Sequence, residues 1–291
     1  MGVIFFMREM NRAMAKFENK SEKLTLGSLF DGAGGFPLAG LRQEIIPVWA
    51  SEIAEKAIAV TKLHFPEMKH LGDIRKINGA NIPPVAIITF GSPCQDWSVA
   101  GQRVGAKKCT NEECEEVEIN FDADECPVCG SLTEVTRSGL FSEAIRIIDE
   151  MRDATNGKYP QWAIWENVPG ALTSGRPKGT DFKTVIEAFT KTKIPMPLSG
   201  RWADAGLVRS DGVNIAWRVF NAAGWELSQR RKRIFLVASY GEACPSEILF
   251  LEKGVFGDIV TSGETEKTSS ATLRNGVESP KQRQLSLADI E

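Results

Sequence analysis

Short apolar runs alternate along this chain with segments whose apolar residues recur at helical spacing. The apolar runs predict strands that are buried on both faces, as in a parallel sheet. We expect them at residues 24–30, 46–51, 85–90, 162–165, 215–221 and 233–239, the last two forming a hairpin. We expect helices at residues 36–44, 53–64, 139–153 and 181–190. The alternation predicts an α/β fold with a doubly wound sheet.

The same pattern divides the chain into three parts. Residues 1–23 are polar with weak helical spacing and form an N-terminal appendage, whereas residues 24–240 carry the α/β pattern. Residues 241–291 are predicted to be a mostly disordered tail or the start of a further region, because periodicity fades and polar residues dominate. The apolar run at 3–7 is too short for a signal sequence or a membrane span, so we expect a cytoplasmic protein.

Charge is concentrated in one insertion. The chain is 42% hydrophobic and 25% charged, with a net charge of −3, which is less basic than nucleic-acid-binding domains usually are. Residues 107–137 hold nine acidic and three basic residues, a net charge of −6. The rest of the chain therefore carries +3, and the acidity belongs to the insertion at 106–136.

This insertion also holds four of the six cysteines, which are Cys109, Cys114, Cys126 and Cys129. In a reducing compartment cysteines are catalytic, metal-bound or simply reduced. Two pairs at short spacing, the second within Cys-Pro-Val-Cys-Gly, predict a zinc ribbon with four thiolate ligands. Reduced surface thiols are the alternative. Because the segment is acidic, we expect it to point away from phosphates or to contact a protein.

A glycine turn follows the first predicted strand. Its residues, Asp-Gly-Ala-Gly-Gly at 31–35, allow a tight connection to the next helix. Glu52 ends the second strand roughly 20 residues later, where an acid can bind ribose hydroxyls. Asp73 follows near a third strand end, in reach of an adenine amine. The glycine turn alone would be an ordinary strand–helix connection, and Glu52 or Asp73 alone would be a surface acid. The three together, in this order, predict a nucleoside site.

A cysteine lies at the same edge of the predicted sheet. Pro93, Cys94 and Gln95 follow the strand at 85–90, and open α/β sheets bind ligands at the carboxyl ends of their strands. A thiolate there is a candidate nucleophile. The alternative is that Cys94 is a small buried apolar residue.

Residues 24–240 resemble the DNA (cytosine-5) methyltransferases. The matching motifs occur in the order of the family, and the ordered set is specific. They are Phe-Asp-Gly-Ala-Gly-Gly at 30–35, Glu52, Asp73, Pro-Cys-Gln at 93–95, Gly-Leu-Phe at 139–141, Glu-Asn-Val at 166–168 and Gln-Arg-Arg-Lys-Arg at 229–233. The resemblance implies a Rossmann-like methyltransferase sheet that binds S-adenosylmethionine, here with a small zinc-ribbon insertion.

The resemblance also implies a role for individual residues. It assigns to the cofactor Phe30, Asp31, Gly32, Gly34, Gly35, Glu52, Ile53, Asp73, Ile74, Pro93 and Leu140. It assigns to catalysis Cys94, which attacks carbon 6 of a flipped-out cytosine, Glu166, which contacts ring nitrogen 3, and Arg231 and Arg233, which hold the base carbonyl and a phosphate. It assigns to substrate binding Gln95, Ser98, Asn167 and Gln229.

One departure from the family leaves alternatives open. The family continues with a target-recognition region and two further motifs, which we do not find after Tyr240. The expected partner is double-stranded DNA, with a possible second chain that supplies target recognition. The alternatives are an inactive or partner-dependent subunit, a tRNA cytosine-5 methyltransferase, and a non-enzymatic zinc-ribbon interaction protein. The host would be a bacterium or a phage.

Overall fold

The fold was determined as a computed structural model. It describes residues 23–92, 107–111, 114, 125–126, 128–131, 133–135, 140–175, 177–222, 231–250 and 284–286. For the strands at 107–109, 133–135 and 284–286 only the backbone is described. The predicted appendage and most of the predicted tail lie outside these residues, so those two boundaries stay predictions.

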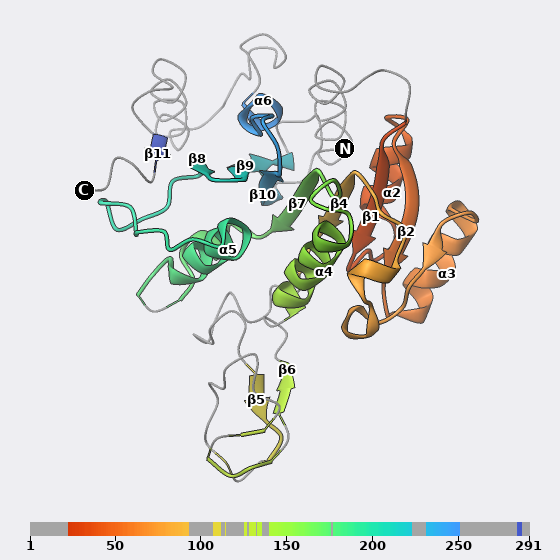
Figure 1. The fold of residues 1–291 in the computed structure, drawn as a ribbon, viewed down its shortest axis with the longest axis horizontal. Helices are drawn as coiled ribbons and strands as arrows, with labels where there is room; N and C mark the ends of the chain where they lie inside the picture. Colours follow the sequence, from red (N-terminus) through yellow and green to blue (C-terminus); the bar gives the residue numbers. More distant parts are fainter. Residues whose placement is uncertain are drawn as a thin grey trace.

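One mixed sheet forms the centre of the molecule (Figure 1). Its nine strands run in the order β11-β8-β9-β10-β7-β4-β1-β2-β3. The strands are β1 (Thr25–Leu29), β2 (Ile46–Ser51), β3 (Lys69–His70), β4 (Ile87–Phe90), β7 (Trp162–Asn167), β8 (Ala205–Ser210), β9 (Val213–Asn221), β10 (Lys232–Ser239) and β11 (Gln284–Ser286). The strands from β7 to β3 pair in parallel, whereas β7, β10, β9 and β8 pair antiparallel.

Helices cover both faces of this sheet. They are α2 (Gly35–Leu41), α3 (Glu55–His64), α4 (Leu140–Ala154), α5 (Thr180–Thr190) and α6 (Ser246–Leu249), with short 3-10 turns η1 (Ile74–Lys76), η2 (Gly79–Asn81) and η3 (Pro169–Leu172). Ile88 packs in the cluster that contains α4 and α5, whereas its neighbour Ile87 packs with α2 and α6. Alternate residues of a strand thus bury on opposite faces. The predicted doubly wound α/β sheet is confirmed.

The predicted elements all occur, with ends shifted by a few residues. The first helix is shorter than expected, because it ends at Leu41 and Glu44 adopts a left-handed φ of 63°. The sequence did not predict β8, α6 or β11. Along β8 only Val208 is buried, so this strand lacks the apolar run that marks the central strands. Among the described residues, no helix is long and apolar enough to cross a membrane.

Two tryptophan–glycine pairs lie at separate places in the sheet. Gly27 of β1 pairs with Trp49 of β2, and Gly206 of β8 pairs with Trp217 of β9. A Cβ atom on either glycine would overlap the ring of its tryptophan. Each indole N–H also donates to a loop carbonyl, that of Pro83 or of Ala203, over 2.9 Å. The rings therefore take up the space that a side chain at the glycine would need.

The insertion forms a separate small sheet. Strands β5 (Lys107–Cys109) and β6 (Thr133–Val135) pair antiparallel, with Cys109 opposite Thr133. Figure 1 shows this hairpin standing apart from the nine-stranded sheet, near the beginning of α4. Among the described residues, the two strands of the insertion thus pair with each other and not with any strand of the main sheet.

Candidate active site

The carboxyl ends of four parallel strands meet at one edge of the sheet. The last residues of β1, β2 and β4 are paired, since Leu29 lies opposite both Ser51 and Phe90, and Phe90 lies opposite Trp165 of β7. Strand β10 runs the other way, so it begins at this edge, with Ile234 opposite Asn167. Antiparallel pairing thus brings the start of β10 beside motifs that follow the ends of the other strands.

The glycine turn after β1 is held open by left-handed backbone. Phe30, Gly32 and Gly34 have φ values of 53°, 56° and 84°, and Gly34 caps α2. The Asp31 N–H donates to the Ser51 carbonyl over 3.1 Å, which ties the turn to β2. A Cβ on Gly32 would meet no atom within 4 Å. A ligand can therefore approach the main chain of the turn closely.

Glu52 joins the glycine turn to the end of β2. Its Oε2 accepts from the Gly32 N–H over 2.8 Å, and its Oε1 accepts from the N–H groups of Ile53 (2.8 Å) and Ala54 (2.9 Å). Because a carboxylate offers about four acceptor positions, one remains open on Oε2 for a hydroxyl donor. The neighbouring Ile53 side chain is 69% exposed. This arrangement fits a ribose with a base beside it.

Asp31 is an uncompensated acid beneath the turn. Its carboxyl is 8% exposed, and neither oxygen has a hydrogen-bond partner among the described residues. Burial raises the pKa of Asp31 to about 6; the nearby Ser28 hydroxyl opposes this and the charge of Glu52 adds to it. A buried acid without a partner favours a cationic ligand, and the sulfonium and ammonium groups of S-adenosylmethionine are cationic. The residues present therefore fit this cofactor.

Asp73 lies at the next strand end but is bound to a neighbour. It caps η1, and Arg75 donates to both of its oxygens from Nε (3.0 and 3.1 Å) and Nη2 (2.6 Å). Hydrogen bonding to Arg75 lowers the pKa of Asp73. An adenine amine would share this carboxylate with the guanidinium. Ile74, the other predicted residue here, is buried in the core.

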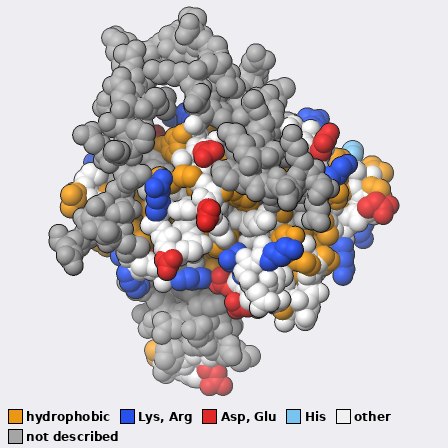
Figure 2. Space-filling model, turned by 45° about the horizontal axis from the view of Figure 1, so that its top comes forward, with side chains coloured by type: hydrophobic (Ala, Val, Ile, Leu, Met, Phe, Trp, Pro, Cys, Tyr) orange, Lys and Arg blue, Asp and Glu red, His pale blue; other side chains and the backbone are white. Residues whose placement is uncertain are grey.

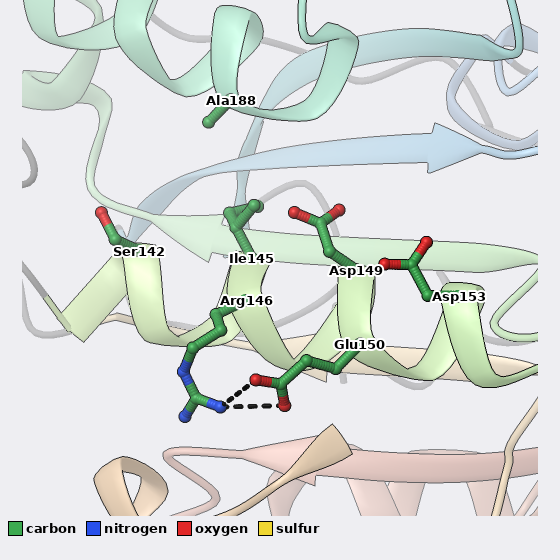
Figure 3. Close-up of a pocket in the computed structure, with 7 residues that line it drawn as sticks. All are labelled: Ser142, Ile145, Arg146, Asp149, Glu150, Asp153 and Ala188. Atoms are coloured by element: carbon green, nitrogen blue, oxygen red, sulfur yellow. Dashed lines mark hydrogen bonds and ion pairs between the residues drawn. The ribbon is translucent and has the colours of Figure 1, made fainter. Parts of the chain in front are cut away.

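Helix α4 supports the segment that follows Asp73 from outside. Arg146 donates to the carbonyls of Ile74 (3.2 Å) and Ile77 (2.8 Å). Its guanidinium is held by Glu143 at 2.6 Å. Glu150 holds it from the other side at 2.8 Å, as Figure 3 shows. The same helix begins at Leu140, another predicted cofactor residue. Arg146 was not predicted as a site residue, although acids three residues before and four after an arginine are typical of a helical ion-pair cluster.

The pocket in Figure 3 lies on the outer side of α4. Asp149, Glu150 and Asp153 line it together with Ser142, Ile145, Arg146 and, from α5, Ala188. Lys191 forms an ion pair with Asp149, and burial raises the pKa of Asp149. The pocket thus belongs to the surface that supports the 74–79 segment and not to the strand-end edge.

At the end of β7, the structure brings together three predicted catalytic residues. Arg231 Nη2 lies 3.7 Å and Arg233 Nε lies 3.4 Å from Oε1 of Glu166. Burial raises the pKa of Glu166, and the two arginines act in the opposite direction. The side chain of Glu166 is 20% exposed, so it remains accessible from the edge. An acid in this setting is suited to exchanging a proton with a ligand.

The stem of the predicted nucleophile loop is fixed beside Glu166. Ser92 is 4% exposed, and its hydroxyl accepts from the indole N–H of Trp165 over 3.1 Å. Asn167 Nδ2 donates to the Ser92 carbonyl at 3.5 Å, and Asn167 Oδ1 accepts from the Val168 N–H. Five predicted site residues lie outside the described residues: Pro93, Cys94, Gln95, Ser98 and Gln229.

Three cysteines of the insertion gather as a metal site requires. The Sγ atoms of Cys114, Cys126 and Cys129 lie within 4.8 Å of one another, and Cys114 and Cys126 are 3.7 Å apart. Zn–S bonds of about 2.3 Å in a tetrahedron place sulfurs about 3.8 Å apart. Gly130, with a φ of 69°, turns the chain back so that its N–H donates to the Cys126 carbonyl. The backbone of Cys109 is on β5, but its side chain is not described.

On the face shown in Figure 2, acidic and basic side chains are interspersed over the described surface. No continuous basic patch is visible there among the described residues.

Comparison with known proteins identifies the family. The family model for C-5 cytosine-specific DNA methylases matches residues 24–113 and 130–285, and the chain belongs to this family. This confirms the resemblance read from the motifs. The type II methyltransferase M.NlaIV of Neisseria lactamica is 30% identical over 219 residues, which cover 72% of this chain and 40% of that protein.

Two further similarities add detail. The DNA N-6-adenine-methyltransferase of Escherichia phage P1 is 26% identical over 282 residues, covering 88% of this chain and 34% of that protein. Among solved structures, the Dnmt2 methyltransferase of S. pombe superposes with a TM-score of 0.50 at 15% identity, over 81% of this chain and 57% of that one. This likeness supports the methyltransferase fold. The chain thus spans only 34% and 40% of the two curated relatives.

Proposed function

We propose that this chain transfers a methyl group from S-adenosylmethionine to carbon 5 of cytosine in double-stranded DNA, through a covalent bond to Cys94. The observation that carries the proposal is the cluster of Glu166, Arg231 and Arg233 beside Ser92, two residues before Cys94. Membership of the cytosine-specific family supports the same chemistry.

The chemistry follows from the residues. Carbon 5 of cytosine is a weak nucleophile, and addition of the Cys94 thiolate to carbon 6 turns the ring into an enamine. Glu166 donates a proton to ring nitrogen 3 as the thiolate adds, which its raised pKa favours. The glycine turn at 31–35 would hold S-adenosylmethionine, whose sulfonium would give its methyl group to carbon 5 and leave as a neutral thioether. Loss of the carbon 5 proton to solvent then expels the Cys94 thiolate, and return of the nitrogen 3 proton to Glu166 restores the neutral aromatic ring and the acid.

The arginines serve the target base in this proposal. Arg231 and Arg233 already face Glu166, so a base held against Glu166 also meets their guanidinium groups. A guanidinium suits both a base carbonyl and a phosphate, because its donors form a planar fork. Since the base is hidden in a duplex, the proposal requires that it is flipped out.

A second candidate target is the adenine amine, which the phage P1 relative is named for. The match covers 34% of that protein, so its name does not assign an activity to the matched part. Methyl transfer to an exocyclic amine needs no covalent nucleophile, and this chain carries Cys94 in the motif order of the cytosine family. We therefore favour cytosine.

The test uses the full chain, alone and together with any second chain that is found to supply target recognition. Radiolabelled methyl transfer is measured on unmethylated DNA and on tRNA, and the product base is identified. We expect 5-methylcytosine in DNA. DNA containing 5-fluorocytosine should trap the chain covalently, and Cys94→Ala should lose the adduct and at least about 10⁴-fold in rate. N6-methyladenine, methylated tRNA, or full activity of Cys94→Ala would each contradict the proposal.

We further propose that the insertion holds one structural zinc ion on Cys109, Cys114, Cys126 and Cys129. The short Sγ distances among three of these cysteines support it. Elemental analysis of protein purified without added metal should find about one zinc per chain. The double variant Cys126→Ser/Cys129→Ser should lose it. Cys244→Ser is the matched control, because Cys244 lies near Ser246 and outside the cluster.

A further inference from the structure

Trp165 reaches from the core to the loop that carries the proposed nucleophile. Its side chain is fully buried, and Ser92, which accepts its N–H over 3.1 Å, is 4% exposed. Ser92 is the last described residue before Pro93 and Cys94. The hydrogen bond therefore fixes the chain two residues before the thiol.

The same indole touches the other segments of the site. Its ring packs edge-on against Phe141, with centroids 6.0 Å apart, and stacks on Phe182 at 6.2 Å. Phe141 follows Leu140 at the beginning of α4, and the residue after Trp165 is Glu166. Three motif segments that are far apart in the sequence thus meet at one ring.

We propose that Trp165 and Ser92 act as positioning residues, which set the direction in which the nucleophile loop leaves β4 relative to Glu166. The inference rests on the proposed function. Its physical basis is that a displacement of about 1 Å between reacting groups can cost about 10²-fold in rate. The donor is on the strand that carries Glu166 and the acceptor on the segment that carries Cys94, so this bond relates the two groups directly.

Three variants separate positioning from general stability. Trp165→Phe keeps a ring for Phe141 and Phe182 but removes the donor, and Ser92→Ala removes the acceptor. The control is Trp202→Phe: Trp202 is also buried, packs edge-on against Phe182 at 5.5 Å, and donates its N–H to the Gly179 carbonyl over 2.8 Å. It removes an equivalent hydrogen bond away from the strand-end edge.

The first measurement is the rate of covalent trapping on DNA containing 5-fluorocytosine, with cofactor affinity measured alongside. Trp165→Phe and Ser92→Ala should each slow trapping by about 10- to 100-fold, with cofactor affinity changed less than about twofold and Trp202→Phe like the wild type. The double variant should be no slower than either single variant, because both remove the same bond. Additive losses, or an equal loss in Trp202→Phe, would overturn the inference.

The second measurement does not depend on activity. Hydrogen exchange of the peptide that begins at Gly91 should become about fivefold faster in Trp165→Phe and in Ser92→Ala, the change that corresponds to one hydrogen bond. Trp202→Phe should leave it unchanged. If the wild type forms no 5-methylcytosine but this contrast holds, the proposed function fails while the positioning contact stands. If exchange is the same in all variants, the positioning contact itself is wrong.

Discussion

Glu52 and Glu166 occupy equivalent places at the ends of two parallel strands, yet their surroundings differ. Glu52 accepts hydrogen bonds from three backbone N–H groups, all between 2.8 and 2.9 Å. Glu166 has two guanidinium neighbours at 3.4 and 3.7 Å, and burial raises its pKa. An acid fixed by the main chain is a stationary acceptor suited to binding. A desolvated acid with loose ion pairs is suited to moving a proton.

The largest effect should come from Glu166, the proposed proton donor. Glu166→Gln keeps the size and the position of the side chain but no longer titrates, so the single-turnover rate of methyl transfer should fall by about 10²- to 10⁴-fold. Cofactor affinity, measured by calorimetry, should change less than about threefold. If Glu166→Gln loses cofactor affinity as strongly as it loses rate, Glu166 would be a cofactor-binding acid like Glu52 and not a proton donor.

Asp31 provides a test of whether a buried charge also destabilises the fold at the predicted cofactor site. Its pKa is raised from 3.8 to about 6 in the folded state, so its contribution to stability is present below pH 4 and is lost as the pH rises through 6. Asp31→Asn should therefore raise the free energy of unfolding at pH 7.5 by up to about 3 kcal/mol.

The measurement is urea unfolding of both proteins at pH 4 and pH 7.5 without cofactor. At pH 4 the advantage of Asp31→Asn should disappear, since the wild-type carboxyl is then protonated. The same variant should bind S-adenosylmethionine more weakly, because the cationic ligand loses its acid. An advantage that is independent of pH would contradict the assigned cause.

Glu52→Ala should weaken S-adenosylmethionine binding about tenfold or more, because a charge-assisted hydrogen bond is worth about 1.5–3 kcal/mol. Calorimetry with the cofactor measures this directly. Glu55→Ala is the matched control, since Glu55 begins α3 three residues later and is exposed. If the Glu52 variant and the wild type bind the cofactor with equal affinity, the prediction that Glu52 binds the ribose is wrong.

The smallest effect is expected at Arg146, which supports the predicted cofactor site from outside through the carbonyls of Ile74 and Ile77. Arg146→Gln should weaken cofactor binding about fivefold, the value of one hydrogen bond, by loosening the 74–79 segment. The rate of methyl transfer at saturating cofactor should stay close to that of the wild type. Asp153→Asn, in the same pocket of Figure 3, is the control. A fall in the saturated rate would place Arg146 nearer to the chemistry than its contacts indicate.

The sequence predicted the parts of this site that follow strand ends. Buried runs such as that ending at Phe90 are recognisable because a parallel strand is apolar on both faces. Contacts made by register were not predictable in this way. The approach of Arg233 to Glu166 depends on β10 pairing antiparallel with β7. The bond from Trp165 to Ser92 joins two residues that no sequence pattern singled out.

Other contacts were not foreseen for a related reason. The assignment of Asp73 to adenine stays a prediction, but its place after a strand does not reveal that Arg75 binds both of its oxygens. Arg146 was overlooked because its partners at Ile74 and Ile77 are backbone carbonyls. Every residue has such a carbonyl, so the sequence does not show which ones an arginine will bind. A short, partly exposed strand such as β8 lacks the apolar pattern on which the prediction depends.

The two tryptophan–glycine pairs have an evolutionary consequence. Because a Cβ on Gly27 or Gly206 would occupy the space of the facing indole, neither glycine can mutate alone without displacing Trp49 or Trp217. A lineage that gains a side chain at one position must shrink the ring at the other, either beforehand or at the same time. We therefore expect these positions to vary as pairs among relatives, with single exchanges removed by selection. The β1–β2 and β8–β9 pairings would then leave a covariation signal on both sides of the sheet.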